Sequence, residues 1–143
     1  MKHVAVGIIS KNGHILACRR KRNAVYPLKW EFPGGKIEPG ETPRQALVRE
    51  LHEELAIEAE PDGEFHQQEW TYAEGTANPE RDGTFRITYF LVFSFRGEPV
   101  NHAFEEIRWV TSAELQAMDT LEGNRAAVEL LVNGKKGDAE RGW

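Results

Sequence analysis

The segment that most constrains the fold is a glycine-rich turn, residues 34–41, that leads directly into a well-marked helix. Thr42 can cap this helix, Pro43 suits the first helical position, and Gln45 completes a capping box. We therefore predict a helix that begins at about Pro43. One stripe of it is apolar and is predicted to face a core; this stripe comprises Leu47, Val48, Leu51 and Leu55.

The same helix carries Glu50, Glu53 and Glu54, whose i, i+3, i+4 spacing places them on one face. On an arbitrary helix such a cluster is most often a solvated surface. Here Arg49 is the nearby cation, and like charges ~6 Å apart repel by roughly 3 kcal/mol per pair at an effective dielectric of about 20. A divalent metal would relieve this repulsion, since Mg²⁺ typically bridges one or two carboxylates to substrate phosphates. The turn and helix together therefore predict a metal and phosphate site.

At these positions the chain resembles the Nudix hydrolases, whose signature joins a glycine turn to a glutamate-rich helix. The matching residues are Gly35, Glu41, Arg49, Glu50, Leu51, Glu53, Glu54 and Ile57. With residue frequencies of roughly 5–10% per position, a chance match is on the order of one in a million. Ala56 stands where the family has a second glycine, which would end the helix in a left-handed conformation at no steric cost.

Within that family the chain looks most like the MutT branch, which cleaves nucleoside triphosphates and prefers oxidised guanine. The similarity lies in residues 5–9, the pair at 19–20, and residues 31–38 and 40–43, and it weakens after about residue 60. The resemblance implies a substrate-binding base site made of Arg20, Glu31, Phe32, Gly34 and Asn124. Val25 stands in the place of a base-site histidine.

Several of these residues have an ordinary structural interpretation as well. Asn124 follows Gly123 before a predicted helix and could simply cap it. Its amide also offers a donor and an acceptor, which can pair with a purine edge. Phe32 could be core or a stacking surface, and the same choice applies to Trp30 and Tyr26.

The resemblance also implies the metal site. Glu53 and Glu54 are expected to bind Mg²⁺, for which Mn²⁺ would be a substitute, and the Gly34 carbonyl is expected to add another oxygen. Glu50 is either a further ligand or the group that orients the attacking water. Metal-bound water has a lowered pKa and is a usable nucleophile near neutral pH.

Other charged residues are expected to support this chemistry. Arg49 is predicted to hold the glutamates in place through hydrogen bonds, and Glu41 is a candidate partner for it. By resemblance a carboxylate from outside the helix joins the metal site, and Glu106 is preferred to Glu105, although either could be a surface charge. Lys36 could stabilise charge on the leaving phosphate or could be a solvated lysine.

The family analogy implies attack at the β-phosphorus, which releases a nucleoside monophosphate and pyrophosphate. The expected function is removal of 8-oxo-dGTP from the nucleotide pool, in support of DNA replication and repair. Two alternatives stay open. One is a pyrophosphohydrolase for CTP, dCTP, ADP-ribose or a dinucleotide, and the other is a weakly catalytic Nudix module that only binds nucleotides.

Composition limits the remaining possibilities. The 143 residues, 40% of them hydrophobic, predict one domain over residues 1–133 followed by a flexible tail, 134–143. The net charge of −5 argues against a nucleic-acid polymer as partner. The basic run at 19–22 is either a solubilising turn or a source of arginines for substrate. The lone Cys18 excludes an internal disulfide and is predicted to be a buried small hydrophobe rather than a nucleophile.

The sequence has no signal-peptide pattern and no apolar run near 18 residues, so we expect a cytoplasmic protein. We also expect a monomer or weak homodimer. We predict strands at 4–9, 14–20, 30–32, 65–72, 85–95 and 107–110, and Asn12-Gly13 as the turn of a hairpin. Residues 73–83 are predicted to form a mobile loop. Thr111 and Glu114 predict a second capping box before a short helix, and a last helix is predicted over 124–132. This pattern predicts an α+β fold, a Nudix-type α/β/α sandwich with a mixed sheet.

Overall fold

The computed structural model describes residues 1–72 and 83–134. The strands are β1 (Lys2–Lys11), β2 (His14–Arg19), β3 (Trp30–Glu31), β4 (Gly34–Lys36), β5 (Glu58–Glu60), β6 (Glu64–Tyr72), β7 (Gly83–Val92), β8 (Ser94–Arg96) and β9 (Glu106–Val110). The helices are α1 (Pro43–Leu55), α2 (Ser112–Ala117) and α3 (Arg125–Asn133), with a 3-10 turn, η1 (Glu122–Asn124), before α3.

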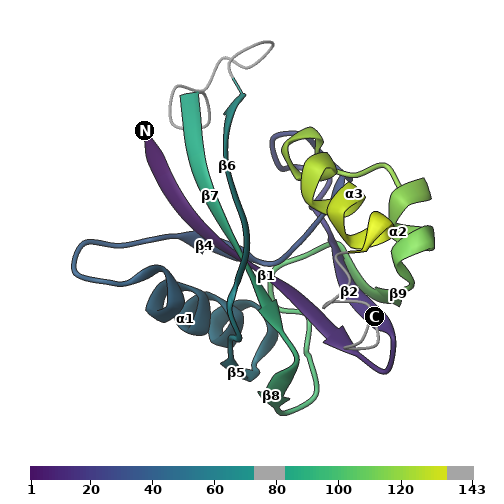
Figure 1. Ribbon diagram of the computed structural model, residues 1–143, viewed down its shortest axis with the longest axis horizontal. Helices are drawn as coiled ribbons and strands as arrows, with labels where there is room; N and C mark the ends of the chain where they lie inside the picture. The colour runs from purple at the N-terminus through teal and green to yellow at the C-terminus, as the bar shows by residue number, and fades with distance from the viewer. Residues whose placement is uncertain (73–82, 135–143) are drawn as a thin grey trace.

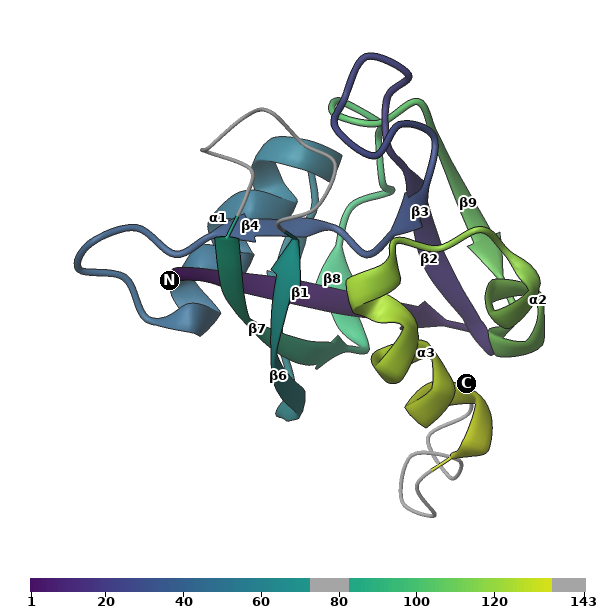
Figure 2. The ribbon, with the colours of Figure 1, turned by 90° about the horizontal axis from the view of Figure 1, so that it is seen from above.

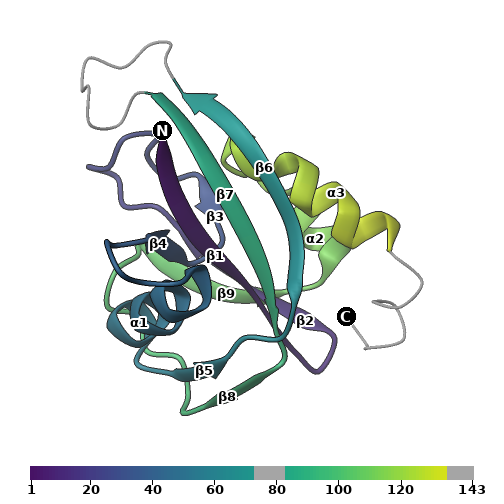
Figure 3. The ribbon, with the colours of Figure 1, turned by 60° about the vertical axis from the view of Figure 1, so that its left-hand side comes forward.

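The main sheet is mixed, with the order β3-β2-β1-β7-β6 and with β4 and β9 paired to β1 and β2. β1 and β7 run parallel, and the other pairs in this sheet are antiparallel. β5 and β8 form a separate two-stranded sheet. α1 lies on one side of the main sheet, and α2 and α3 lie on the other (Figures 1 and 3). The predicted α+β sandwich with a mixed sheet is therefore confirmed.

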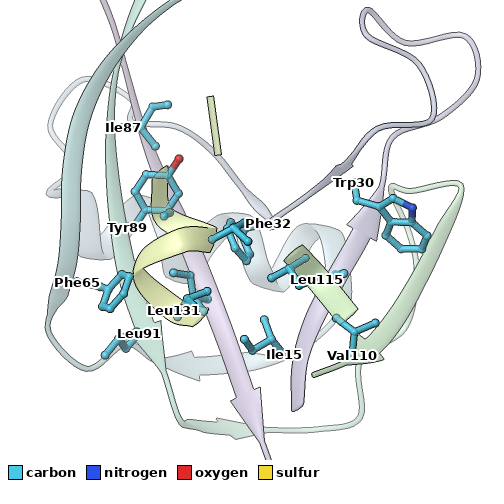
Figure 4. Close-up of a cluster of buried hydrophobic side chains, with 14 residues drawn as sticks. Ile15, Trp30, Phe32, Phe65, Ile87, Tyr89, Leu91, Val110, Leu115 and Leu131 are labelled. Atoms are coloured by element: carbon cyan, nitrogen blue, oxygen red, sulfur yellow. The ribbon is translucent and has the colours of Figure 1, made fainter. Parts of the chain in front are cut away.

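Two hydrophobic clusters hold these layers together. Alternate residues of β1 point to opposite faces, so that Ile8 joins one cluster and Ile9 the other. The first cluster packs beneath α2 and α3 and includes Phe32 and Tyr89 (Figure 4). The second cluster packs against α1 and includes the fully buried Cys18, which confirms its prediction as a core residue. The glutamate helix is thus anchored to one face, while the opposite face carries a second core.

The helix caps and the hairpin turn predicted from the sequence are confirmed. Thr42 and Thr111 both cap helices through complete capping boxes. Asn12 and Gly13 have φ of 52° and 78°, as a two-residue hairpin turn requires. Ala56 ends α1 with φ 57° and ψ 30°, and its N–H donates to the His52 carbonyl at 3.0 Å. Alanine therefore adopts the left-handed conformation that a glycine would adopt without strain.

Some boundaries were predicted wrongly. The strand expected at 85–95 breaks at Phe93, whose N–H donates to the Asp62 carboxylate at 2.9 Å, and the chain continues as β8 beside β5. Val48, predicted to belong to the apolar stripe, is 36% exposed, and Ala46 is buried instead. β1 is longer than the predicted 4–9, at Lys2–Lys11.

The last helix begins at Arg125 rather than at residue 124. Gly83 belongs to β7, so the predicted loop at 73–83 is wrong at that residue, and 73–82 lie outside the described residues. Gly134 caps α3, and the rest of the predicted tail also lies outside them. Among the helices the structure describes, none is long and apolar enough to cross a membrane.

Candidate active site

Two glycines let the α1 glutamates lie directly against the sheet. β4 lies beside α1 and follows β3 in the chain (Figure 2). At Gly34, whose φ is 151°, a Cβ would lie 2.2 Å from the Ala5 carbonyl oxygen. At Gly35 a Cβ would lie 2.4 Å from the Glu50 carboxyl carbon. The backbone clash and the positive φ require glycine at Gly34, whereas a Cβ at Gly35 would displace the Glu50 carboxyl from its place.

Glu54 is the most buried of the helix carboxylates. Its Oε1 accepts a hydrogen bond from the Gly34 N–H at 3.0 Å. Burial, followed by the charge of Glu50, raises the pKa of the Glu54 carboxyl to about 8. Burial also raises the pKa of Glu50, against the lowering effect of Arg49. The ionised forms of these carboxyls are therefore unfavourable without a metal, and a bound cation would stabilise them.

Arg49 connects the glycine turn to the helix carboxylates. Its Nε and Nη2 donate to the two Glu41 oxygens at 2.8 and 2.9 Å, and Nη1 donates to Glu50 at 3.0 Å. Nη2 also donates to the Lys36 carbonyl at 3.1 Å. The hydrogen bonds from Arg49 lower the pKa of Glu41 to about 2. The predicted positioning role of Arg49 is thus matched by its contacts.

The carboxylates are close to one another without forming a closed cage. In residues 1–72 and 83–134 no group of three or more His, Cys, Asp or Glu side chains is arranged to hold a metal ion. The Glu53 side chain is 56% exposed, and its Oε1 accepts from Arg49 at 3.4 Å. Because Mg²⁺ typically keeps several waters and takes one or two carboxylates together with substrate phosphates, this open donor set fits Mg²⁺.

Glu105 and Glu106 have other partners. The Glu106 carboxylate accepts from Arg108 at 2.7 Å and lies 4.0 Å from the Arg19 guanidinium. Glu105 pairs with Arg22 at 3.6 Å. Within the described part of the chain, the ion pairs and hydrogen bonds of these two carboxylates are with Arg19, Arg22 and Arg108 and not with residues of α1.

A cavity of about 450 Å³ adjoins the glycine turn. It is lined by Val4, Val6, Arg20, Val25, Tyr26, Glu31, Phe32, Gly34, Gly35, Lys36, Tyr72, Phe85, Ile87, Leu121 and Asn124. All five residues expected at the base site are among them. Since Gly34 and Gly35 also contact the α1 carboxylates, the cavity and the acidic face share a wall.

Arg20 is fixed on two sides. Its Nη1 donates to the Glu31 carboxylate at 3.1 Å, while Nε and Nη2 donate to the Val25 carbonyl at 2.8 and 2.6 Å. Burial raises the pKa of Glu31, and the Arg20 charge opposes this shift. Of the basic run, only Arg20 lines the cavity, whereas Arg19 and Arg22 pair with carboxylates.

Asn124 does not cap α3, so that interpretation is wrong. Its backbone is already helical, with φ −94° and ψ −7°, and its side chain makes no capping hydrogen bond. Instead its Oδ1 accepts from the Tyr89 hydroxyl at 2.6 Å. The sequence analysis missed Tyr89, although Phe85, Ile87 and Tyr89 alternate along β7 and therefore share one face.

The aromatic residues divide between core and cavity. Phe32 is 4% exposed and belongs to the core, yet it also lines the cavity. Trp30 is core, and the Arg19 and Arg108 guanidinium groups lie over its ring. Tyr26 lines the cavity with its ring centre 5.3 Å from that of Tyr72.

The chain is similar to several known proteins. Residues 1–131 match the NUDIX domain. The chain is 37% identical over 129 residues to an 8-oxo-dGTP diphosphatase of Escherichia coli (90% of this chain, 94% of the relative). It is 36% identical over 117 residues to a CTP pyrophosphohydrolase of the same organism (80% of this chain, 78% of the relative). The crystal structure of a MutT NUDIX hydrolase from Burkholderia pseudomallei superposes with a TM-score of 0.76 at 25% identity, covering 90% of this chain and 95% of that one.

Proposed function

Because the chain belongs to the Nudix hydrolase family, we propose that it is a Mg²⁺-dependent nucleoside triphosphate pyrophosphohydrolase that acts on 8-oxo-dGTP. The products would be the nucleoside monophosphate and pyrophosphate. The observation that carries this proposal is the shared wall: Gly34 and Gly35 contact the acidic face of α1 and also line the cavity that holds Arg20 and Asn124. A base in the cavity would thus direct its phosphates towards the carboxylates.

On this proposal Glu53, Glu54 and the Gly34 carbonyl hold Mg²⁺, and Glu50 either binds it too or orients the attacking water. Bound there, Mg²⁺ would supply positive charge to the phosphate oxygens and lower the pKa of a bound water. Glu54 suits this role because it is buried beside other carboxylates, so its ionised form is unfavourable until a cation binds. Glu53 is the solvent-facing member, open to an incoming metal and phosphate complex.

The remaining residues position these groups. Arg49 keeps Glu50 oriented while it is held by Glu41, so that the helix carboxylate keeps one geometry. Lys36 lines the cavity beside the glycine turn, where its ammonium group can offset phosphate charge. Glu106 stays a predicted further ligand, and to serve as one it would have to exchange its hydrogen bonds to Arg108.

Within the cavity, Arg20, Glu31, Phe32 and Asn124 recognise the base. Phe32 forms part of the wall, and its ring meets Tyr89 edge to face with centres 6.1 Å apart. Since Arg20 is already tied to Glu31 and to the Val25 carbonyl, its guanidinium is held in place before a base arrives. Such preorganisation favours binding because less side-chain freedom is lost.

The proposal is tested by steady-state kinetics with Mg²⁺ on 8-oxo-dGTP, dGTP, CTP, dCTP and ADP-ribose, with products identified by mass and ¹⁸O-water used to locate the attacked phosphorus. We expect the highest kcat/KM for 8-oxo-dGTP and ¹⁸O in pyrophosphate, as attack at the β-phosphorus requires. ¹⁸O in the monophosphate would instead place the attack at the α-phosphorus. Preference for CTP or dCTP would instead favour the activity of the 36% identical relative. Absence of turnover for every compound would refute the enzymatic proposal.

Variants separate the metal and base roles. Glu53→Gln should lower kcat by roughly 10²-fold, since a charged group at the reacting phosphates is lost. Glu60→Gln is the matched control, because Glu60 is exposed on β5. Asn124→Ala should raise KM for the preferred base more than for the others. Unchanged turnover in Glu53→Gln, or an equal loss for all bases in Asn124→Ala, would remove the corresponding assignment.

A further inference from the structure

The turn that carries Asn124 is held by hydrogen bonds to side chains from two strands of the sheet. The Gly123 N–H donates to the Tyr72 hydroxyl at 2.7 Å, and the Gly123 carbonyl accepts from the Gln68 amide. A Cβ on Gly123 would lie 2.0 Å from the Tyr72 hydroxyl oxygen, so only glycine fits there. Tyr89, on β7, holds the same turn by donating a hydrogen bond to the Asn124 side chain. The position of Asn124 at the cavity wall is therefore set by β6 and β7.

Tyr89 also determines which end of the Asn124 amide faces the cavity. A phenol has one proton to donate, and the Tyr89 hydroxyl lies 2.6 Å from Oδ1 of Asn124 but 3.2 Å from the Gly123 carbonyl. The proton belongs on the shorter contact, and the Gly123 carbonyl keeps its hydrogen bond from Gln68. With Oδ1 engaged in this way, the amide nitrogen is the group left for a ligand.

The surroundings of that nitrogen agree. Nδ2 of Asn124 makes no hydrogen bond to the residues that the structure describes, and it is not among the buried polar atoms that lack a partner. Because Asn124 lines the cavity, its N–H₂ group is open to a base there. Tyr89 is fully buried, and its ring lies 5.7 Å from His66 and 6.1 Å from Phe32, so the hydroxyl is held in place.

From this geometry we propose that Tyr89 is a positioning residue that locks the Asn124 amide with its donor towards the cavity, and thereby selects bases whose reading edge carries a carbonyl oxygen over those that carry an exocyclic amine. The proposal rests on the proposed function only in placing a base in this cavity. Guanine presents O6 and thymine O4 as acceptors, whereas adenine and cytosine present amino donors at the corresponding positions. A donor facing an amino group leaves both unpaired.

The selection can be measured without catalysis. Two pairs of nucleotides differ at one exocyclic group, oxo or amino, and at the hydrogen on the ring nitrogen beside it: dIMP with dAMP, and dUMP with dCMP. Dissociation constants would be measured by isothermal titration calorimetry on the full chain in EDTA. For the better-binding pair we expect the wild type to prefer the oxo member by roughly tenfold, the effect of one hydrogen bond against one unpaired donor.

Two variants test the lock. Tyr89→Phe removes the hydroxyl and lets the amide turn over, so the preference should fall to about twofold. Asn124→Asp keeps the shape but offers only acceptors, so the preference should invert towards the amino member. Thr111→Ala, which removes the cap of α2 far from the cavity wall, controls for destabilisation alone and should keep the wild-type ratio.

The ratio within each pair is the deciding readout, because a merely structural loss would weaken both members equally. An equal affinity for both members in the wild type, an unchanged ratio in a folded Tyr89→Phe, or an unchanged ratio in Asn124→Asp would each overturn the proposal. Where Tyr89→Phe fails to fold, Asn124→Asp decides, because the ratio inverts only if the amide presents its donor to the base. If the pairs behave as expected while 8-oxo-dGTP is not hydrolysed, the proposed function fails and this inference stands.

Discussion

Glu54→Gln should stabilise the metal-free protein while it removes activity. Burial, with the charge of Glu50, raises the pKa of Glu54 from 4.5 to about 8. Between these two values the folded protein keeps a proton that the unfolded chain releases. The folded state then binds more protons than the unfolded state, so this carboxyl makes stability fall as pH rises through that window.

The size of the effect follows from the shift. One pKa unit corresponds to about 1.36 kcal/mol. The Glu54 shift therefore costs about 1 kcal/mol at pH 5 and about 4 kcal/mol at pH 8. Glutamine carries no charge, and its side-chain oxygen can still accept from the Gly34 N–H. The variant should thus exceed the wild type in free energy of unfolding by these amounts, with the gap widening as pH rises.

The assay is urea unfolding followed by tryptophan fluorescence, in EDTA, at several values from pH 5 to pH 8. Glu60→Gln, at an exposed position of β5, is the matched control for the loss of one carboxylate. Adding millimolar Mg²⁺ should stabilise the wild type and leave Glu54→Gln unchanged. A gap that does not grow with pH, or a variant less stable than the wild type at pH 8, would refute the electrostatic argument.

Three further substitutions test the local geometry. Ala56→Gly should raise the free energy of unfolding by about 0.5–1 kcal/mol in urea and leave kcat unchanged, because alanine holds φ at 57°. Gly35→Ala should lower kcat, since its Cβ would meet the Glu50 carboxyl carbon at 2.4 Å and displace that carboxyl; a fully active variant would contradict this. Arg49→Lys should lower activity by roughly 10–100-fold in Mg²⁺ titrations, because lysine cannot make the two-pronged contact with Glu41.

The features that the sequence predicted correctly depend on residues that are close together in the chain. Thr42 with Gln45, and Thr111 with Glu114, are capping boxes because the partners are three residues apart. The hairpin at Asn12 depends likewise on adjacent residues. The joining of the acidic helix to the glycine turn was also expected, because the motif itself connects them.

What the sequence did not reveal depends on contacts between distant segments. Phe93 leaves the main sheet for Asp62, 31 residues earlier. Tyr89 and Asn124 are 35 residues apart, and no local pattern connects them. The role of Val25 was hidden for another reason: it supplies a backbone carbonyl to Arg20, which every residue type carries. Side-chain identity therefore located the cavity residues, while their mutual orientation came only from the fold.

The two halves of the site differ in how far they are complete before a ligand binds. In the cavity, Arg20 is satisfied by Glu31 and by the Val25 carbonyl, and Asn124 is held by Tyr89. On the helix, burial and the charge of Glu50 raise the pKa of the Glu54 carboxyl, and no cationic side chain in the described part of the chain is among the groups that offset this shift. On the proposed function, a base would enter a preformed cavity, whereas the phosphate side would gain most from an added cation. This asymmetry separates recognition from turnover: nucleotide binding should survive in EDTA, and hydrolysis should require the divalent metal.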